Sequence, residues 1–444
     1  MTLVRAEVTE VLGEYDHAIE FADKDNFVII YGPNGVGKTR FLEVIHALSR
    51  LEGRKLARMP FATATLIYSN GTVLGVESSD KKSFSSVQPS WRNRQLHFVL
   101  HQLGHAAQNW NYQGEDFEDW LVDNSPWSPI DHEDLWEDSR DGELAHLVDL
   151  ERRYPEGGRV VKAKMPPSFA EFREQSASYL IETQRLRIEK SRAPRGIQWR
   201  TSTQAPTRSS KIAQHASKMR SLVNDAQTEH STITQQLDRT FPNRVLSEST
   251  ADRDASGIRR RYEEQNEFRS RLGRVVSVAL ADALSLPDRL LADWELRLLN
   301  LYLDDADEKL APFGTLLMKI ELLEEIVNSR LLNKRLQVTA KDGLTVLHEP
   351  DGRIIDLESL SSGEQHEIIL MFDLLFNVPA GALVLIDEPE ISLHVVWQLA
   401  FIPDVQRIAA LAGFRFVVAT HSPQIINDQW SRAVRLGPPE VAFS

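Results

Sequence analysis

The sequence contains no cysteine among its 444 residues. This absence excludes disulfides, zinc or iron–sulfur sites with cysteine ligands, and a catalytic thiol. The chain also lacks an apolar run close to the ~20 residues that a membrane-spanning helix needs. The N-terminal stretch MTLVRAEVTEVLGEYD carries acidic residues within its apolar part, so it does not match a secretory signal. We therefore expect a cytoplasmic protein.

The negative charge of the chain is concentrated in one segment. The whole chain has 51 Lys and Arg against 64 Asp and Glu, a net charge of −13. Thirteen acids and one basic residue fall in Glu115–Asp149, so this segment alone contributes −12. The rest of the chain is almost neutral, and the overall acidity therefore does not exclude nucleic acid as a partner.

The strongest motif is GPNGVGKT, which follows the apolar segment FVIIY and precedes a helical pattern. It matches the phosphate loop, whose backbone N–H groups and helix N-terminus hold phosphates. We predict that Lys38 reaches the β- and γ-phosphates of a nucleotide and that the Thr39 hydroxyl binds Mg²⁺. The residues predicted to bind nucleotide here are Gly32, Pro33, Asn34, Gly35, Val36, Gly37, Lys38, Thr39 and Arg40.

A second motif, ALVLIDEPE, reads as a buried strand that ends in carboxylates. Asp387 is placed to hold Mg²⁺ and Glu388 to polarise the attacking water, which are parts that phosphoryl transfer requires. By itself the strand could end in a solvated acidic turn. Its combination with a phosphate loop favours the catalytic interpretation.

The segment LSSGEQ, Leu360–Gln365, precedes an apolar helix. Taken alone, it is best explained as a helix cap formed by Ser361 or Ser362. Taken with the acidic strand about twenty residues later, it closely resembles the signature motif of ABC-type ATPases. In the same pattern Gln184, in ETQRL, stands at the glutamine loop, ISLH stands at the D-loop, and His421, in THSPQII, stands at the switch histidine.

The chain resembles the SMC/RecF-like group of ABC-type ATPases, and more closely the bacterial ATPases related to OLD nucleases. The resemblance implies an α/β fold, an ABC-type core with a mixed sheet flanked by helices. We expect the N-terminal part of this core in 1–190, with an acidic, Trp-rich insertion at about 104–158. A helical lobe is expected in 191–335, with breaks near Pro242, Pro287 and Pro312, and the C-terminal part of the core in 336–444.

The resemblance also implies a mechanism. Two copies face head to tail, and each ATP lies between the phosphate loop of one chain and the signature of the other. Nucleotide binding in trans is assigned to Ser361, Ser362, Gly363 and Glu364. Catalysis is assigned to Glu388, His421 and Gln184. The Mg²⁺ ligands are Thr39, Gln184 and Asp387, so the expected cofactors are ATP and Mg²⁺.

The parts of the sequence outside the ATPase motifs indicate which branch of the SMC/RecF-like group the chain resembles. Only twenty-three residues follow His421, too few for the Toprim nuclease domain of OLD-type enzymes. This layout resembles the ATPase components of anti-phage systems such as PARIS or Septu, and we expect a sensor or scaffold, a homo-oligomer, that controls a separate nuclease or toxin. Two alternatives stay open: a RecF/SMC-like ATPase of DNA repair or maintenance, and a structural assembly hub with slow turnover.

Two charged regions offer further binding surfaces. Basic residues cluster in 190–220 and in 258–274, where they could follow a DNA backbone or form a solvated helix face. The acidic segment carries tryptophans, which suggests an insertion packed by its own aromatic residues, a docking surface for a basic partner or for self-assembly, or a nucleic-acid mimic. His132, Glu133 and Asp134 are a weak metal signal.

Overall fold

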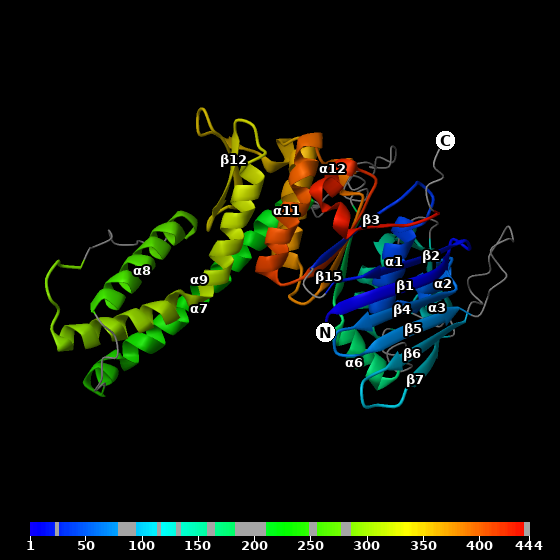
Figure 1. Ribbon diagram of the computed structural model, residues 1–444, viewed down its shortest axis with the longest axis horizontal. Helices are drawn as coiled ribbons and strands as arrows, with labels where there is room; N and C mark the ends of the chain where they lie inside the picture. The colour runs from blue at the N-terminus through cyan, green and yellow to red at the C-terminus, as the bar shows by residue number, and fades with distance from the viewer. Residues whose placement is uncertain are drawn as a thin grey trace. The chain divides into compact units, whose positions relative to one another are not determined.

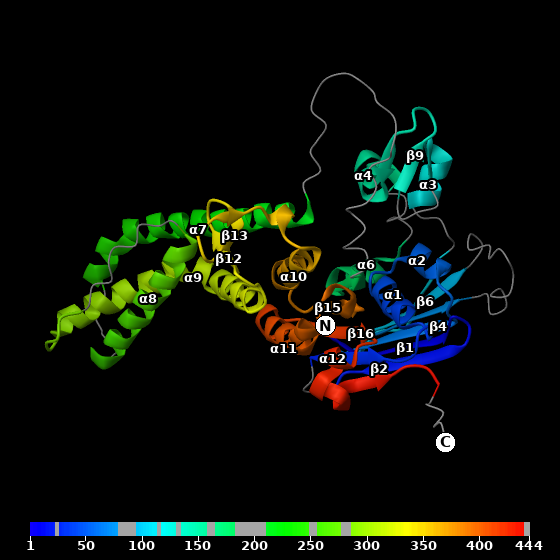
Figure 2. The same ribbon diagram turned by 90° about the horizontal axis from the view of Figure 1, so that it is seen from above.

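The computed structural model describes residues 1–22, 26–78, 95–112, 117–129, 135–157, 165–182, 210–247, 255–276 and 286–438. Gln184, the segment 131–134 and most of the basic stretch 190–220 lie outside these residues, so the predictions made for them stay predictions. The chain divides into two units (Figures 1 and 2). Unit 1 comprises Met1–Ser191 and Val378–Ser444, and unit 2 comprises Arg192–Asn377.

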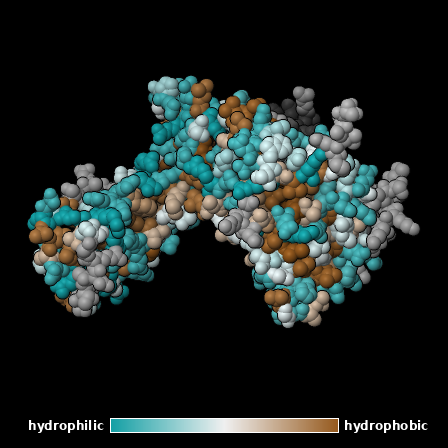
Figure 3. All heavy atoms as spheres, in the orientation of Figure 1, coloured by the Kyte–Doolittle hydropathy of each residue, from teal (hydrophilic) through white to brown (hydrophobic). Residues whose placement is uncertain are grey.

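Unit 1 contains an antiparallel sheet of six strands in the order β2-β1-β4-β5-β6-β7. The strands are β1 (Leu3–Val11), β2 (Tyr15–Glu20), β4 (Thr63–Tyr68), β5 (Val73–Ser78), β6 (Leu96–His101) and β7 (Gln108–Tyr112). In β4 every second residue is buried, so one face of the sheet packs on the core. Hydrophobic residues also gather on the face of unit 1 seen in Figure 3. The partly exposed Ile67 and Val73 pair with each other across β4 and β5.

The second sheet of unit 1 is parallel, in the order β11-β15-β16-β3-β17. Its strands are β3 (Phe27–Tyr31), β11 (Ser178–Glu182), β15 (Leu383–Asp387), β16 (Arg415–Thr420) and β17 (Ala433–Arg435). All five residues of β15 are buried, as expected for a central strand covered on both faces.

The helices of unit 1 complete its core. They are α1 (Lys38–Ser49), α2 (Gly53–Arg58), α6 (Pro167–Gln175), α11 (Val395–Ala412), α12 (Pro423–Ile426) and the 3₁₀ turns η6 (Pro389–Ser392) and η7 (Asn427–Arg432). Helix α1 buries Phe41, Leu42 and Ile45 in one cluster with residues of both sheets. Of the described helices, only α11 is long and apolar enough to cross a membrane, and it buries Phe401, Ile402 and other residues inside the protein.

The acidic insertion has a small core of its own. It comprises α3 (Phe117–Asn124), a sheet of β8 (Trp127–Pro129), β9 (Leu135–Asp138) and β10 (Leu144–His146), and α4 (Leu147–Arg153). Trp127 and Trp136 are only 2% and 1% exposed and pack with Phe117, Leu121 and Leu150. The interpretation as an insertion packed by its own tryptophans is confirmed for these two residues. Of the acids in Glu115–Asp149 whose side chains are described, Asp138 is buried, and Asp123, Glu137, Asp141, Glu143 and Asp149 are exposed.

The described residues of unit 2 form three long helices, a small sheet and the helix that follows the signature. Its elements are α7 (Lys211–Ser247), α8 (Ala255–Val275), α9 (Asp293–Asn328), β12 (Lys334–Thr339), β13 (Gly343–His348), β14 (Ile354–Ile355), the 3₁₀ turn η4 (Leu357–Ser359), α10 (Ser362–Phe372) and the π-helical turn η5 (Asp373–Asn377). Residues 336–377 pack within unit 2, where α10 lies on α7 and α9. The predicted start of the C-terminal part of the core at 336 stays a prediction.

Two of the expected helix breaks are wrong. Helix α7 continues through Pro242 and α9 through Pro312, although proline removes a backbone donor and crowds the preceding turn. Side chains bond to carbonyls near both prolines. His230 bonds to the carbonyl of Lys309 at 2.6 Å, and Arg244 donates to the carbonyl of Leu237 at 2.9 Å. Pro287 lies in the loop before α9, as expected.

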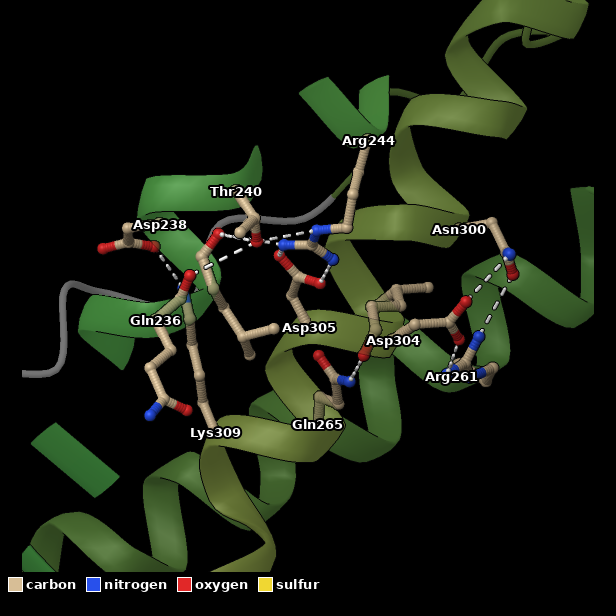
Figure 4. A network of polar contacts seen from close by, with 12 residues as sticks. Gln236, Asp238, Thr240, Arg244, Arg261, Gln265, Asn300, Asp304, Asp305 and Lys309 are labelled. Carbon is tan, nitrogen blue, oxygen red and sulfur yellow. Dashed lines mark hydrogen bonds and ion pairs between the residues drawn. The ribbon is translucent and has the colours of Figure 1, made fainter. Parts of the chain in front are cut away.

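The arginines of 258–274 hold α8 against α9. Arg259 donates to the carbonyls of Pro287 and Arg289, both at 2.8 Å, at the loop that precedes α9. Three others make ion pairs with residues of α9: Arg261 with Asp304 and Asp307, and Arg271 and Arg274 with Glu321. Figure 4 shows the contact between Arg261 and Asp304. These pairs favour a structural role for the basic stretch over a free phosphate-binding stripe, since the guanidinium groups already have carboxylate partners.

Candidate nucleotide site

The phosphate loop, Asp387 and His421 all follow the carboxyl ends of adjacent parallel strands. In the sheet register Asp387 of β15 lies beside Ala419 of β16, and Thr420 lies beside Tyr31 of β3. Because the strands are parallel, the residues after each of them meet at one edge of the sheet, where α/β proteins bind ligands. The sheet thus brings together three motifs that are far apart in the sequence.

Glycines shape the phosphate loop. A side chain at Gly32, where φ is 157°, would place its Cβ 2.3 Å from the carbonyl oxygen of Leu436. At Gly37, where φ is 87°, a Cβ would lie 2.6 Å from Val11. By contrast, a Cβ at Gly35 would meet nothing within 4 Å, so the middle of the loop borders open space. A glycine-rich loop before the N-terminus of a helix, open on this side, suits a phosphate group.

Lys38 lies buried at the base of the loop, 5% exposed. Its Nζ donates to the carbonyls of Gly32 and Pro33, at 2.9 and 3.0 Å, and to Nδ1 of His421 at 3.3 Å. An ammonium group has three protons, so these acceptors use all of them. Burial lowers the pKa of Lys38, while the nearby carboxylates, Glu388 first among them, oppose the shift.

Thr39 and Asp387 are in direct contact. The Thr39 hydroxyl donates to Oδ2 of Asp387 at 2.9 Å, across 348 positions of the sequence. Asp387 is 8% exposed. A hydroxyl and a carboxylate oxygen side by side, at the edge of an open loop, are the hard oxygen ligands that Mg²⁺ prefers. The residues present therefore fit the predicted Mg²⁺ site.

Glu388 has a strained backbone. Its φ and ψ of 47° and 56° place it in the left-handed region, which costs a non-glycine residue on the order of 1–2 kcal/mol. Its N–H donates to the carbonyl of Ala419 at 2.8 Å, which ties it to β16. Its carboxylate lies 3.4 Å from Nε2 of His421. Because Nδ1 of this histidine accepts from Lys38, the proton belongs on Nε2, facing Glu388.

Two residues of this site were not predicted. Glu390 accepts a hydrogen bond from the backbone N–H of His421 at 2.7 Å and so fixes the loop that carries the histidine. Its place in the DEPE motif was a usable signal. His17 of β2 is buried and bonds to the carbonyl of Val36 at 2.7 Å, inside the phosphate loop. No sequence signal links a histidine 19 residues upstream to this carbonyl.

Arg40 is exposed on α1. Its guanidinium pairs with Glu43, three residues further along the helix, at 2.5 Å. Its predicted contact with nucleotide stays a prediction.

The signature residues begin α10 in unit 2. Ser361 caps the helix: its hydroxyl accepts from the N–H of Glu364 at 3.3 Å, and the Glu364 carboxylate accepts from the N–H of Ser361 at 2.9 Å. Lys334 donates to both oxygens of Glu364, at 2.8 and 2.9 Å. Ser361 and Ser362 remain exposed. Glu364 is thus occupied in supporting the cap, and its predicted contact with nucleotide stays a prediction.

Residues 173–427 match a protein family described as "AAA domain, putative AbiEii toxin, Type IV TA system". The matched range covers more than half of the chain. The chain belongs to this AAA-domain family. The range contains the signature, the acidic strand and His421, and it begins after the phosphate loop.

Solved structures of SMC head domains are similar to this AAA-domain chain. The Smc head domain of Pyrococcus furiosus, with an extended coiled coil and bound to the C-terminal domain of ScpA, is 12% identical, with a TM-score of 0.34 and coverage of 98% of this chain and 93% of that chain. The SMC head domain from Thermotoga maritima is 10% identical, with a TM-score of 0.33 and coverage of 99% and 100%. Likeness at this level says nothing of partners or activity. The search of curated proteins gave no match.

The expected fold class is confirmed. The core of this AAA-domain chain is that of an ABC-type P-loop ATPase, with sheets flanked by helices, and it carries a helical unit and an acidic insertion. A P-loop ATPase family implies ATP as ligand and, as a rule, Mg²⁺.

Proposed function

We propose that this protein binds and hydrolyses ATP in the presence of Mg²⁺, at the edge of the parallel sheet in unit 1. One observation carries the proposal: the contact between Thr39 and Asp387, with Lys38, Glu388 and His421 joined by further contacts beside it. Phosphoryl transfer needs a metal, a positioned water and positive charge near the phosphates, and this cluster offers residues for each.

Each residue has a role that its geometry supports. Lys38 and the loop amides bind the phosphates, and Thr39 and Asp387 would hold Mg²⁺, which when bound neutralises charge on the phosphate oxygens. Glu388 accepts a proton of the attacking water and orients it. His421 donates from Nε2 toward the same place, where it can bond to the terminal phosphate or keep Glu388 in position.

Signature residues complete the site in trans within a head-to-tail pair of chains. Ser361 and Ser362 are exposed at the N-terminus of α10, where free backbone N–H groups and the helix dipole favour a bound anion. Under this proposal a single chain holds an incomplete site, and ATP binding drives pairing of chains.

The test is an ATPase assay on the full chain. Glu388→Gln keeps the size of the side chain and removes its basicity, so we expect ATP binding to persist while hydrolysis falls by about a hundredfold or more. Glu174→Gln, an exposed position on α6, is the matched control and should hydrolyse ATP at the wild-type rate. Hydrolysis by Glu388→Gln at the wild-type rate would rule out this role.

We further propose that the ATPase acts as a sensor or scaffold that controls a separate effector, a nuclease or toxin, in anti-phage defence. The family's description as a putative toxin of a type IV TA system supports a role in a toxin system, and it is the layout of the sequence motifs that motivates a separate effector. The test is to express the chain with its neighbouring genes and to measure phage plating and proteins that co-purify. The wild type should lower plating and retain the effector, whereas Lys38→Ala should do neither. Unchanged plating with the wild type would contradict the defence role.

A RecF/SMC-like ATPase acting directly on DNA is the second candidate, supported by the basic composition of 190–220 and 258–274. The ion pairs of α8 weaken the support from the second stretch. Stimulation of ATP hydrolysis by duplex DNA, with a steep loss of binding as salt rises, would favour this candidate.

A further inference from the structure

A buried histidine lies behind the phosphate loop. His17 of β2 is 3% exposed, and its ring lies parallel to that of Tyr15 and edge-on to that of Phe41, with ring centroids 6.1 and 5.6 Å away. Its Nε2 lies 2.7 Å from the carbonyl oxygen of Val36. A carbonyl oxygen only accepts hydrogen bonds, so Nε2 carries a proton and donates it. The two aromatic neighbours thus hold the imidazole in a pose in which it binds the loop.

The side chain of Val36 is held as well. It is 3% exposed and belongs to the hydrophobic cluster of unit 1. A Cβ at Gly32 would lie 3.5 Å from one of its methyl groups, and a Cβ at Gly437 would lie 2.7 Å from the other. Val36 is therefore fixed at its side chain by close packing and at its carbonyl by His17.

The peptide that joins Val36 to Gly37 has two possible orientations. Gly37 has a φ of 87° and a ψ of 25°, and glycine accepts φ values of either sign, so Gly37 itself does not prevent a flip of this peptide. In a trans peptide the C=O and N–H groups point to opposite sides. The bond from His17 to the Val36 carbonyl therefore turns the Gly37 N–H to the side away from His17.

This N–H group is available to a ligand. Gly37 directly precedes the first residue of α1, where backbone N–H groups have no partner within the helix. Among the described residues, no carbonyl accepts a hydrogen bond from the Gly37 N–H. N–H groups at the start of a helix attract an anion, whereas a carbonyl oxygen turned into the same place repels one. The orientation of this one peptide thus affects how well the loop binds phosphate.

We propose that His17 is a positioning residue for the phosphate loop: its bond to the Val36 carbonyl keeps the Gly37 N–H turned toward the phosphates of the nucleotide. The inference rests on the proposed function, because it requires that the loop binds nucleotide. His17 acts only through the peptide and touches no nucleotide. Without its bond the peptide flips, which weakens phosphate binding in the ground state and in the transition state alike. KM therefore rises, while kcat changes little.

Two amide variants separate the roles of the two ring nitrogens. In His17→Gln the side-chain amide reaches the place of Nε2 and keeps a donor for Val36. In His17→Asn the shorter side chain places its amide near Nδ1, which lies 3.1 Å from the carbonyl of Asp16. We expect the Kd of the full chain for ADP with Mg²⁺, measured by calorimetry, to rise at least about tenfold in His17→Asn and less than about threefold in His17→Gln. His17→Phe keeps a ring beside Tyr15 and Phe41 without a donor and should bind as weakly as His17→Asn.

Steady-state ATP hydrolysis distinguishes positioning from a merely structural role. His17→Asn and His17→Phe should raise KM for ATP at least about tenfold and change kcat less than about threefold. A partial loss of folded protein would instead lower kcat at an unchanged KM, and thermal unfolding of each variant reports the folded fraction. If His17→Asn does not fold, the comparison of His17→Phe with His17→Gln decides in its place.

The outcomes separate this inference from the proposed function. If the wild type binds ADP and His17→Asn and His17→Phe bind it as tightly as His17→Gln does, the positioning role is overturned and the nucleotide site stands. A fall in kcat at unchanged KM overturns it equally. If the wild type binds neither ADP nor ATP, the proposed function itself is wrong, and the positioning role is overturned with it.

Discussion

At the scale of single residues, the site combines the buried ammonium group of Lys38 with the carboxylate of Glu388, a residue whose backbone is strained. Lys38 is held by two loop carbonyls and His421, and Glu388 is held in the left-handed region by its bond to Ala419. A non-glycine residue stays in the left-handed region only where the surrounding contacts hold it there, and such residues are frequent at active sites. The histidine connects the two groups, because each of its ring nitrogens faces one of them.

A histidine behind this site makes the fold sensitive to acid. His46 of α1 bonds to the hydroxyl of Ser178 at 2.8 Å. Burial lowers the pKa of His46 from an ordinary 6.5 to about 4. The unfolded chain therefore binds a proton below pH 6.5 that the folded chain refuses until about pH 4, and stability is lost as the pH falls through this window.

His46→Asn should remove this dependence while keeping a polar group near Ser178. We expect the free energy of unfolding of the wild type to fall by up to about 3 kcal/mol more than that of the variant between pH 7 and pH 4. Urea unfolding at several pH values measures the difference. His105→Asn, at an exposed loop position, is the control. Parallel curves for the wild type and His46→Asn would contradict the account.

At the scale of elements, charged pairs fix the signature helix α10 within unit 2. Lys334 holds Glu364 at its start, and Lys211 and His215 lie 3.1 Å from Asp373 where it ends. Arg330, just after α9, pairs with Glu367 in its middle, with side chains only 4% and 2% exposed. The position of the signature serines thus depends on the helices of unit 2.

Removing one partner of the buried Arg330–Glu367 pair should lower the free energy of unfolding far more than replacing both partners with apolar residues. Glu367→Ala leaves a buried guanidinium short of its partner, so we expect a loss of about 3–5 kcal/mol in the free energy of unfolding. The double variant Arg330→Met, Glu367→Leu removes both charges and should lose much less. Thermal and urea unfolding compare the two. If the double variant is as unstable as the single one, the packing of the two side chains, and not their charge pairing, stabilises this position.

The sequence predicted the elements that carry strong local signals. The apolar strands before GPNGVGKT and within ALVLIDEPE, and the helices after GKT and LSSGEQ, lie where their patterns placed them. The expected breaks failed at Pro242 and Pro312, where α7 and α9 continue as helices that pack on each other. Packing of this kind belongs to the tertiary structure, and local propensity does not contain it.

In the site, too, the sequence predicted the residues of strong local motifs but not the tertiary contacts. Lys38, Thr39 and Asp387 were predictable, since each has a required place in its motif. The left-handed backbone of Glu388 and the support from His17 were not, because they depend on tertiary contacts, with Ala419 of β16 and with the carbonyl of Val36 in the phosphate loop.

At the scale of the whole molecule, the acidic insertion and the ATPase core have separate hydrophobic clusters. Replacing residues 113–164 with a short Gly-Ser linker should therefore leave the core folded, with ATP hydrolysis near the wild-type rate and a melting temperature changed by no more than a few degrees. If the insertion docks a partner or supports assembly, pull-down or native mass should change. An unfolded or inactive product would show that the core depends on the insertion.

The composite site is the central claim of the account, and mixing two inactive variants tests it most directly. Lys38→Ala removes the phosphate-binding ammonium in unit 1, and Ser361→Arg blocks the signature in unit 2. Each variant alone should be inactive, whereas an equal mixture should recover up to about one quarter of the wild-type ATPase rate, because half of the pairs are mixed and each holds one intact site. A soluble, folded mixture that stays inactive would contradict a signature acting in trans.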